Sequence, residues 1–276
     1  MKDVMKVYQV QSKVCASKED TLNAVSWWMK KAAAAGADLV ALPEMFSCPY
    51  DTAAFPKYAE AVGGPLWRRC ADLAKAYGMY LSAGSMPELG LGGKIYNTAY
   101  VFDRQGHQIA RHRKMHLFDI HVDGGQQFRE SDTLTPGNDV TVFDTEFGRM
   151  GLCICYDIRF PELARLMALA KARVVLVPAA FNMTTGPAHW ELTFRARALD
   201  NQMFFLGTAP ARDRTASYRS WGHSIAVDPW GTVLAQLEEG EDAQLVTLDL
   251  KRVSAIRRQL PLLQHRRADC YKLEAV

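Results

Sequence analysis

Apolar runs and helix-like repeats of apolar residues alternate along the first part of the chain. The run Val4–Gln11 predicts a strand. Ser17, with Asp20 three residues later, forms a capping pattern for a helix. The apolar face of that helix would consist of Leu22, Val25, Trp28, Met29 and Ala32. Residues 38–42 then predict a buried strand, so the chain begins as a strand–helix–strand unit typical of α/β proteins.

The next segments continue this alternation but add a hairpin. Pro65 suits the first turn of a helix and Gly78 its exit, and a strand at 79–85 follows. The runs Ile95–Phe102 and Gln108–Arg113 flank a turn-rich tetrapeptide and predict two antiparallel strands. The sheet that contains them is therefore expected to be mixed rather than wholly parallel.

The second half resumes the pattern after a long stretch without periodicity. Residues 119–138 are rich in Gly, Asp, Gln and Thr and predict an irregular loop, which at this length is more often functional than idle. Further strands are predicted at 140–143, 149–155 and 173–177, and helices at 161–171 and 187–201. Four closing strands, for which antiparallel pairing is expected, lie at 203–208, 224–227, 233–237 and 244–248.

Length and composition favour one soluble domain that acts on small molecules. The 276 residues are 49% hydrophobic, and no linker or repeat divides them, so we expect a single domain over residues 1–276. Its tail from about residue 250 is expected to contact another subunit. The net charge of +3 is spread along the chain, which argues against nucleic acid or an acidic membrane as a partner.

The compartment is predicted from what the sequence lacks and from its thiols. The first residues have no uninterrupted apolar core of a secretory signal, and no run of about eighteen apolar residues predicts a membrane span. Six cysteines lie scattered over a large chain, a pattern typical of reduced intracellular thiols. A cytoplasmic location is therefore expected.

Three segments far apart in the chain carry residues for amide chemistry. Glu44 follows a buried strand, Lys114 follows a β-like segment, and Cys155 lies at a strand-to-helix junction. Cleaving an amide through a thioester needs a nucleophile, a proton shuttle and a positive site for the oxyanion. Cys155 would be the nucleophile, its pKa lowered by a neighbouring lysine. Glu44 would transfer the protons, and Lys114 with the backbone N–H of Tyr156 would bind the oxyanion.

Other interpretations of these residues remain open at the level of the sequence. Cys153 and Cys155 are two residues apart and face the same side of a regular strand, so either thiol could be the nucleophile; the turn after the strand favours Cys155. Three histidines near Lys114 suggest a metal, but their spacing fits no compact zinc pattern. We therefore expect no metal and no cofactor. These histidines are His112, His116 and His121.

The three motifs, at 42–46, 113–118 and 151–162, resemble those of the nitrilase superfamily of carbon-nitrogen hydrolases, and the resemblance covers essentially the whole chain. It implies a four-layer α-β-β-α sandwich with mixed sheets, and homodimers or larger homo-oligomers. Segments at 47–50, 181–190 and 209–224 are similar to the omega-amidase branch, which implies hydrolysis of 2-oxo dicarboxylic acid monoamides. The stretches at 156–160 and 184–190 also resemble the sister enzyme that hydrolyses deaminated glutathione.

The resemblance also implies roles for individual residues. Glu44, Lys114 and Cys155 match the family triad, and Glu130 matches a further active-site glutamate that positions substrate and lysine. Residues expected to bind the substrate, whose distal carboxylate suits the guanidinium, are Tyr50, Arg159, Phe181 and Thr185.

Two alternatives stay beside this assignment. Arg159 could instead pair with Glu162 or Glu44 and brace the turn. A chain that keeps the fold without turnover, as a binding or scaffold protein, is the alternative of another class. The sequence also departs from the family's usual pattern at Cys153, where glycine is common, and at 122–127.

Overall fold

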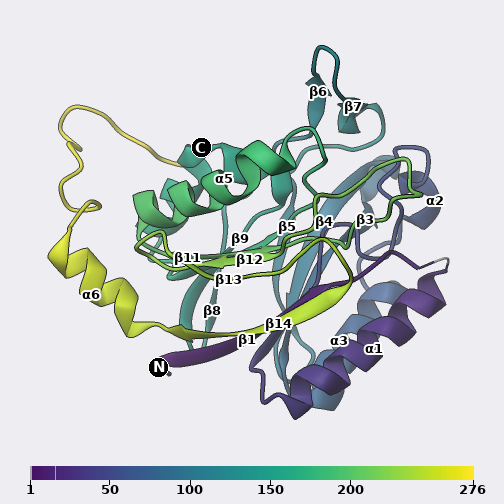
Figure 1. Ribbon diagram of the computed structural model, residues 1–276, viewed down its shortest axis with the longest axis horizontal. Helices are drawn as coiled ribbons and strands as arrows, with labels where there is room; N and C mark the ends of the chain where they lie inside the picture. Colours follow the sequence, from purple (N-terminus) through teal and green to yellow (C-terminus); the bar gives the residue numbers. More distant parts are fainter. Residues whose placement is uncertain (1, 16) are drawn as a thin grey trace.

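Two six-stranded sheets face each other in the computed structural model, which describes residues 2–15 and 17–276 (Figure 1). The first sheet has the strand order β14-β1-β2-β3-β4-β5. Its strands are β1 (Val4–Gln11), β2 (Leu39–Ala41), β3 (Tyr80–Leu89), β4 (Ile95–Phe102), β5 (Gln108–Arg113) and β14 (Asp242–Asp249). The second sheet has the order β13-β12-β11-β10-β9-β8. Its strands are β8 (Thr141–Thr145), β9 (Gly148–Leu152), β10 (Val174–Pro178), β11 (Phe204–Thr208), β12 (Ile225–Val227) and β13 (Val233–Gln236).

Helices cover the outer face of each sheet. α1 (Lys18–Ala34) and α3 (Pro65–Tyr77) lie against the first sheet, and α4 (Pro161–Leu169) and α5 (Gly186–Asn201) against the second (Figure 1). Two shorter helices are α2 (Phe55–Tyr58) and α6 (Lys251–Gln259). The result is a four-layer α-β-β-α sandwich with mixed sheets, which confirms the predicted fold class. Within the described ranges, no helix has both the length and the apolar character needed to cross a membrane.

The two sheets have the same plan, in which a parallel centre is extended by antiparallel strands. β1, β2 and β3 run parallel in one sheet, and β9, β10 and β11 in the other. The closing strands are antiparallel as predicted, but β14 does not stay in the second sheet. It pairs with β1 of the first sheet, from Val4 opposite Asp249 to Gln11 opposite Asp242. The end of the chain therefore ties the two sheets together.

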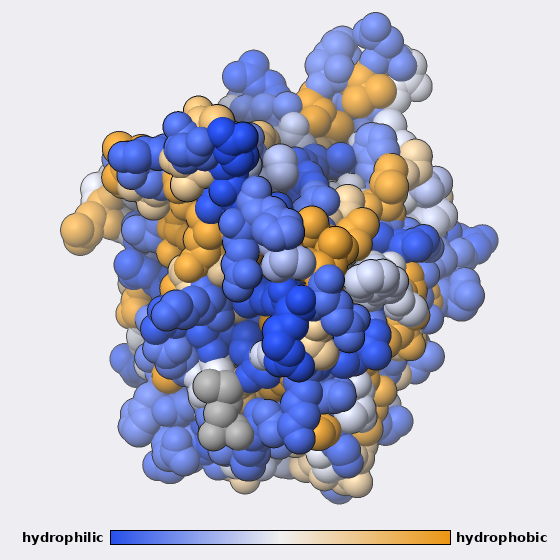
Figure 2. Space-filling view, turned by 90° about the vertical axis from the view of Figure 1, so that its left-hand side faces the viewer, coloured by the Kyte–Doolittle hydropathy of each residue, from blue (hydrophilic) through white to orange (hydrophobic). Residues whose placement is uncertain are grey.

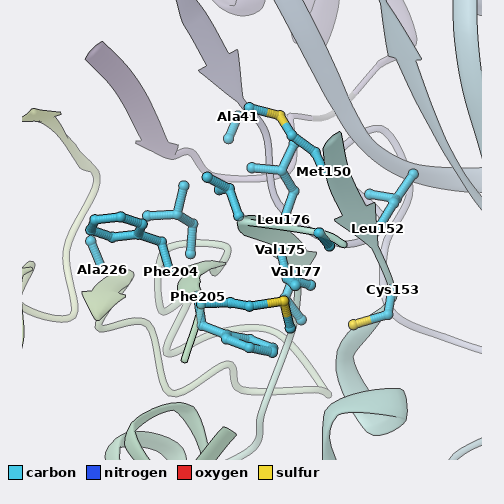
Figure 3. Close-up of a cluster of buried hydrophobic side chains, with 14 of the residues drawn as sticks. Ala41, Met150, Leu152, Cys153, Val175, Leu176, Val177, Phe204, Phe205 and Ala226 are labelled. Atoms are coloured by element: carbon cyan, nitrogen blue, oxygen red, sulfur yellow. The ribbon is translucent and has the colours of Figure 1, made fainter. Parts of the chain in front are cut away.

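Strands in the middle of this sandwich are buried on both faces. Met5 and Val7 of β1 face the second sheet, whereas Val10 faces α1 and α3. Figure 3 shows part of the core that includes residues of both sheets, with Ala41 and Leu176 among its labelled side chains. Contacts between the sheets are also polar, since the buried amide of Gln9 donates to the carbonyl oxygen of Gly207 over 2.9 Å.

Several predicted boundaries are confirmed by local physical contacts. The Ser17 hydroxyl accepts a hydrogen bond from the backbone N–H of Asp20 over 3.1 Å, and α1 begins at the next residue, Lys18. α3 begins at Pro65 and ends before Gly78, whose φ of 59° is the left-handed value that glycine accepts without strain.

Three predictions about local structure need correction. The stretch 119–138 is not wholly irregular, because it forms a hairpin of β6 (Asp119–His121) and β7 (Gln127–Arg129) followed by the 3-10 turn η2 (Glu130–Asp132). β9 ends at Leu152 rather than at residue 155, since the chain turns there into η3 (Cys155–Arg159). The segment from residue 250 begins with α6, which no helical pattern predicted.

Candidate active site

Glu44, Lys114 and Cys155 each lie just beyond the end of a strand. Glu44 is the third residue after β2 of the first sheet, and Cys155 is the third after β9 of the second. Lys114 follows β5 directly. Since β2 and β9 are central parallel strands, these ends are where α/β proteins place ligand-binding groups. All three side chains are buried, with exposed fractions of 1%, 0% and 4% for Glu44, Lys114 and Cys155.

A close approach of two strands holds the Glu44 segment in place. Gly84 of β3 has a φ of 55°, and a Cβ there would lie 2.1 Å from the carbonyl oxygen of Pro43, so only glycine fits. One residue on, the Ser85 hydroxyl accepts from the N–H of Met45 over 3.0 Å. Met45 itself has a φ of 50°, an uncommon value for a residue with a side chain. This backbone turns the Glu44 carboxylate toward the second sheet.

The Glu44 carboxylate connects the two sheets. Its Oε1 accepts from the Asn97 side-chain amide over 2.9 Å and from Lys114 Nζ over 3.0 Å, both from the first sheet. Its Oε2 accepts from the backbone N–H of Ala180, two residues beyond β10 of the second sheet, over 2.8 Å. Asn97 is a site residue that the sequence reasoning missed, because a single asparagine within a strand carries no motif.

Lys114 lies between two carboxylates. Its Nζ also donates to Glu130 over 2.9 Å and contacts the Tyr50 hydroxyl at 3.3 Å. Burial alone would lower the pKa of Lys114, but the charges of Glu130 and Glu44 outweigh it and raise that pKa. The ammonium is therefore a fixed positive charge at neutral pH.

Glu130 is held in turn by groups from the loop and from Tyr50. Its Oε2 accepts from the backbone N–H of Phe118 over 2.7 Å, and its Oε1 accepts from the Tyr50 hydroxyl over 2.6 Å. Burial raises the pKa of Glu130, while the Lys114 charge acts against this rise. The β6–β7 hairpin adds Phe128, whose ring lies 5.5 Å from that of Tyr50. The structure thus brings Glu130 and Tyr50 to the predicted site.

Cys155 has a thiol with an unexpected protonation state. Burial, followed by the charge of Glu44, raises the pKa of this thiol well above its ordinary value, and the opposing effect of Lys114 is smaller. Lys114 does lower the pKa of Cys155, as predicted, but burial and the Glu44 carboxylate outweigh it, and the sequence did not reveal how deeply the thiol is buried beside a carboxylate. The resting thiol is protonated, and its hydrogen-bond partner is Glu44.

The two cysteines of this segment occupy different surroundings. Cys155 has a φ of 47°, so the chain reverses at that residue and directs its side chain toward Glu44 and Lys114. Both thiols are buried in the same hydrophobic core, with Cys153 3% exposed (Figure 3), so the two cysteines differ in their charged neighbours and not in burial. Burial raises the pKa of Cys153 as well, and the charge of Asp157 adds to the rise. Only Cys155 has the surroundings of a nucleophile.

The remaining predicted residues form a second group beside Cys155. The Arg159 guanidinium lies 4.5 Å from the centre of the Phe181 ring, and its Nη1 is 3.0 Å from His189 Nδ1. Neither Glu162 nor Glu44 forms an ion pair with Arg159, and its Nε is buried with no hydrogen-bond partner among the residues described. The Thr185 hydroxyl donates to Asn182 Oδ1 over 3.0 Å rather than pointing freely outward.

A cavity of about 400 Å³ adjoins the first group. Glu44, Tyr50 and Tyr218 lie on its wall, whereas Cys155 and Arg159 are not among its lining residues. Tyr218 stacks on Tyr50 with ring centres 4.4 Å apart, and its hydroxyl donates to the carbonyl oxygen of Ala180. Tyr218 was not predicted as a site residue, although it lies within a segment on which the resemblance rests.

A four-layer sandwich with a buried carboxylate, ammonium and thiol at its strand ends is typical of hydrolases that act on carbon–nitrogen bonds through a cysteine. Comparison with known proteins agrees. The chain belongs to the carbon-nitrogen hydrolase family, whose sequence model matches residues 6–258. The predicted membership and hydrolase class are therefore confirmed.

Individual relatives are similar over almost their whole length. An omega-amidase of Xenopus laevis is 48% identical over 269 residues, which are 98% of this chain and 97% of the relative. The omega-amidase of Homo sapiens is 44% identical over 265 residues, 96% of each chain. A crystal structure from Saccharomyces cerevisiae, described as a member of branch 10 of the nitrilase superfamily, superimposes with a TM-score of 0.89 at 38% identity and covers 97% of this chain and 98% of that one.

Proposed function

We propose that this chain is an omega-amidase that hydrolyses 2-oxo dicarboxylic acid monoamides, such as 2-oxoglutaramate and 2-oxosuccinamate, to the 2-oxo acid and ammonia. The observation that carries the proposal is the buried Lys114 ammonium, held by Glu44 and Glu130 beside the Cys155 thiol. The omega-amidases among the relatives add the substrate class.

The first half of the reaction forms a thioester. Because the pKa of the Cys155 thiol is raised, the proton must leave as the sulfur attacks, and Glu44 is the acceptor that already bonds the thiol. The amide carbonyl oxygen becomes an oxyanion that the Lys114 ammonium and the backbone N–H of Tyr156 bind. When the tetrahedral intermediate collapses, Glu44 returns the proton to the leaving nitrogen, and ammonia departs.

The second half consumes one water molecule. Glu44 is again ionised after ammonia leaves, so it can accept a proton from water as the oxygen attacks the thioester carbonyl. Lys114 and Tyr156 bind the second oxyanion in the same place. Collapse then breaks the carbon–sulfur bond, the Cys155 sulfur recovers the proton from Glu44, and the 2-oxo acid is released.

Arg159 is proposed to bind the carboxylate of the substrate at the end distant from the amide. Its side chain is half-buried and forms no ion pair with a carboxylate among the described residues, so an anionic substrate would supply the missing partner. The flat guanidinium packs over the ring of Phe181. Tyr50 and Thr185 complete the predicted binding residues, the first through its contact with the triad and the second at the start of α5.

The proposal also covers the domain, the compartment and the assembly of the enzyme. We propose a single domain over residues 1–276 that acts in the cytoplasm, without a cofactor, and associates as a homodimer or larger homo-oligomer through its tail. Figure 2 shows apolar patches scattered among hydrophilic side chains on the side of the molecule where α6 and the tail lie. Leu260 and Tyr271 of this tail are 39% and 54% exposed, surfaces that a second copy would cover.

The test is ammonia release by the purified protein from 2-oxoglutaramate and from deaminated glutathione. Turnover of the first substrate, abolished in Cys155→Ala and retained in Cys153→Ala, is the expected result. Turnover of deaminated glutathione alone would make the protein its amidase. If neither compound releases ammonia, the omega-amidase proposal fails and the scaffold interpretation gains support.

A further inference from the structure

Two residues beyond Cys155, a buried carboxylate binds the two segments that carry the nucleophile and the lysine. Asp157 is 1% exposed. Its Oδ2 accepts from the backbone N–H of Ile154 over 3.0 Å and from His112 Nε2 over 2.9 Å. Its Oδ1 accepts from the backbone N–H of His116 over 2.9 Å and from His116 Nδ1 over 2.8 Å. Each carboxylate oxygen therefore accepts two hydrogen bonds.

The charge on Asp157 defines which atoms donate. Burial alone would raise the pKa of Asp157, but hydrogen bonds from His112 and His116 outweigh it and hold the pKa well below its usual range. The carboxylate is ionised, so the ring nitrogens that face it, Nε2 of His112 and Nδ1 of His116, must each carry a hydrogen. The other ring nitrogen of His112 lies 2.9 Å from the Thr141 hydroxyl on β8.

These partners lie next to the proposed catalytic residues. Ile154 directly precedes Cys155, whose φ of 47° is a strained value for a residue with a side chain. His112 and His116 stand two residues before and two residues after Lys114. One carboxylate thus fixes the strained backbone at the end of β9 relative to both sides of the lysine at the end of β5.

We propose that Asp157, through His112 and His116, is the positioning residue that holds Cys155 and Lys114 in register across the two sheets. Asp157 would act through the two segments and not on the substrate. The inference rests on the proposed function, because it assumes that Cys155 and Lys114 act together. It gives a role to a carboxylate at the centre of the nucleophile turn that takes no part in the proposed chemical steps.

The test compares three substitutions with a matched control. Asp157→Asn presents an amide N–H₂ to one pair of donors, so either Ile154 with His112 or the two groups of His116 lose their acceptor. His116→Phe keeps the stacking on Phe160, now at 3.6 Å between ring centres, but removes the donor, whereas His116→Asn restores a donor near Nδ1. The control is Asp228→Asn. Asp228 is equally buried and accepts from the backbone N–H of Trp230 and Thr232, far from the site.

Two readings are taken for each variant: kcat and KM for 2-oxoglutaramate, and the rate at which iodoacetamide alkylates Cys155, followed by mass spectrometry of its peptide. We expect Asp157→Asn and His116→Phe to lower kcat by roughly 10- to 100-fold with KM within about threefold, since small misplacements of reacting groups have such effects. Alkylation should slow in both. His116→Asn should recover most of the activity, and Asp228→Asn should lower the melting temperature only.

Three results would overturn the inference. The first is an unchanged kcat: Asp157→Asn would turn over as fast as the wild type when both rates are divided by the amount of unmodified Cys155. The second is an equal loss in His116→Phe and His116→Asn, because the hydrogen bond would then be irrelevant. The third is a similar loss in Asp228→Asn. If Asp157→Asn does not fold, the His116 pair still decides. The alkylation rates need no turnover, so they test the positioning role even if the proposed activity fails.

Discussion

Replacing Lys114 with methionine tests whether the lysine charge offsets the cost of burying two carboxylates in the folded protein. Glu44 and Glu130 are 1% and 0% exposed, and Lys114 Nζ lies 3.0 and 2.9 Å from their oxygens. Methionine keeps most of the side-chain volume but removes the charge. Breaking a buried ion pair by removing one partner typically costs about 3–5 kcal/mol, because the remaining charge is left uncompensated. The loss in Lys114→Met should fall in this range.

The assay is urea unfolding followed by tryptophan fluorescence at a constant protein concentration. With an m-value of about 3 kcal/mol per molar urea for a chain of this size, the expected loss moves the midpoint down by about 1–1.7 M at pH 8. Lys18→Met is the matched control. Lys18 contacts Glu60 at 2.6 Å, but the two side chains are 30% and 18% exposed, and such pairs contribute only about 0–1 kcal/mol.

The loss should also depend on pH, with a sign that follows from Glu130. Its pKa is already raised by burial, with Lys114 opposing the rise. Without the lysine the folded-state pKa rises further above the unfolded value. The unfavourable contribution is then present above the folded-state pKa and disappears as pH falls through it. Lys114→Met should therefore lose less stability at pH 5 than at pH 8. A loss below about 1 kcal/mol at pH 8, or an equal loss at both pH values, would refute this reasoning.

Two further substitutions test the proposed roles of individual groups. Glu44→Gln should lower kcat by about 10²- to 10⁴-fold, the usual contribution of general acid–base catalysis. It should also shift the pH midpoint of Cys155 alkylation downward, because it removes a charge that raises the thiol pKa. An unchanged or higher midpoint contradicts that electrostatic account. Arg159→Lys should raise KM for 2-oxoglutaramate by roughly tenfold, because lysine lacks the planar fork that binds a carboxylate, yet leave hydrolysis of a neutral amide unchanged. Equal effects on both amides in steady-state assays would show that Arg159 does not bind the carboxylate of the substrate.

Strand ends could be predicted from the sequence because each is marked locally. Pro43 closes the strand before Glu44, and the hairpin turn at 103–106 sets the strand that Lys114 follows. Sequence periodicity therefore placed the candidate residues on the correct elements. The resemblance added what periodicity lacks, namely that these elements belong to two sheets that face each other.

Contacts between distant segments could not be predicted in this way. His112 and Asp157 are separated by 45 positions, and no motif around either residue indicates that the two are in contact. Strands β6 and β7 have three residues each, too short to show an alternation, so the hairpin that carries Phe128 was hidden in an apparent loop. In α6 only Val253 and Ile256 are buried, and two apolar positions are too few to define a helical face.

The protonation state of Cys155 illustrates the same limit and has a consequence for the mechanism. A lysine in the same proposed site as a cysteine suggests a thiolate, but in the fold burial and Glu44 outweigh the lysine. Glu44, which adds to the rise of the thiol pKa caused by burial, is also the proposed base, so in the proposed mechanism the reactive sulfur is generated only as the substrate carbonyl is attacked. In this proposal Lys114 stabilises the oxyanion rather than a thiolate in the resting enzyme. The enzyme would thus keep its nucleophile protonated between turnovers, which lowers the rate of side reactions that require a thiolate.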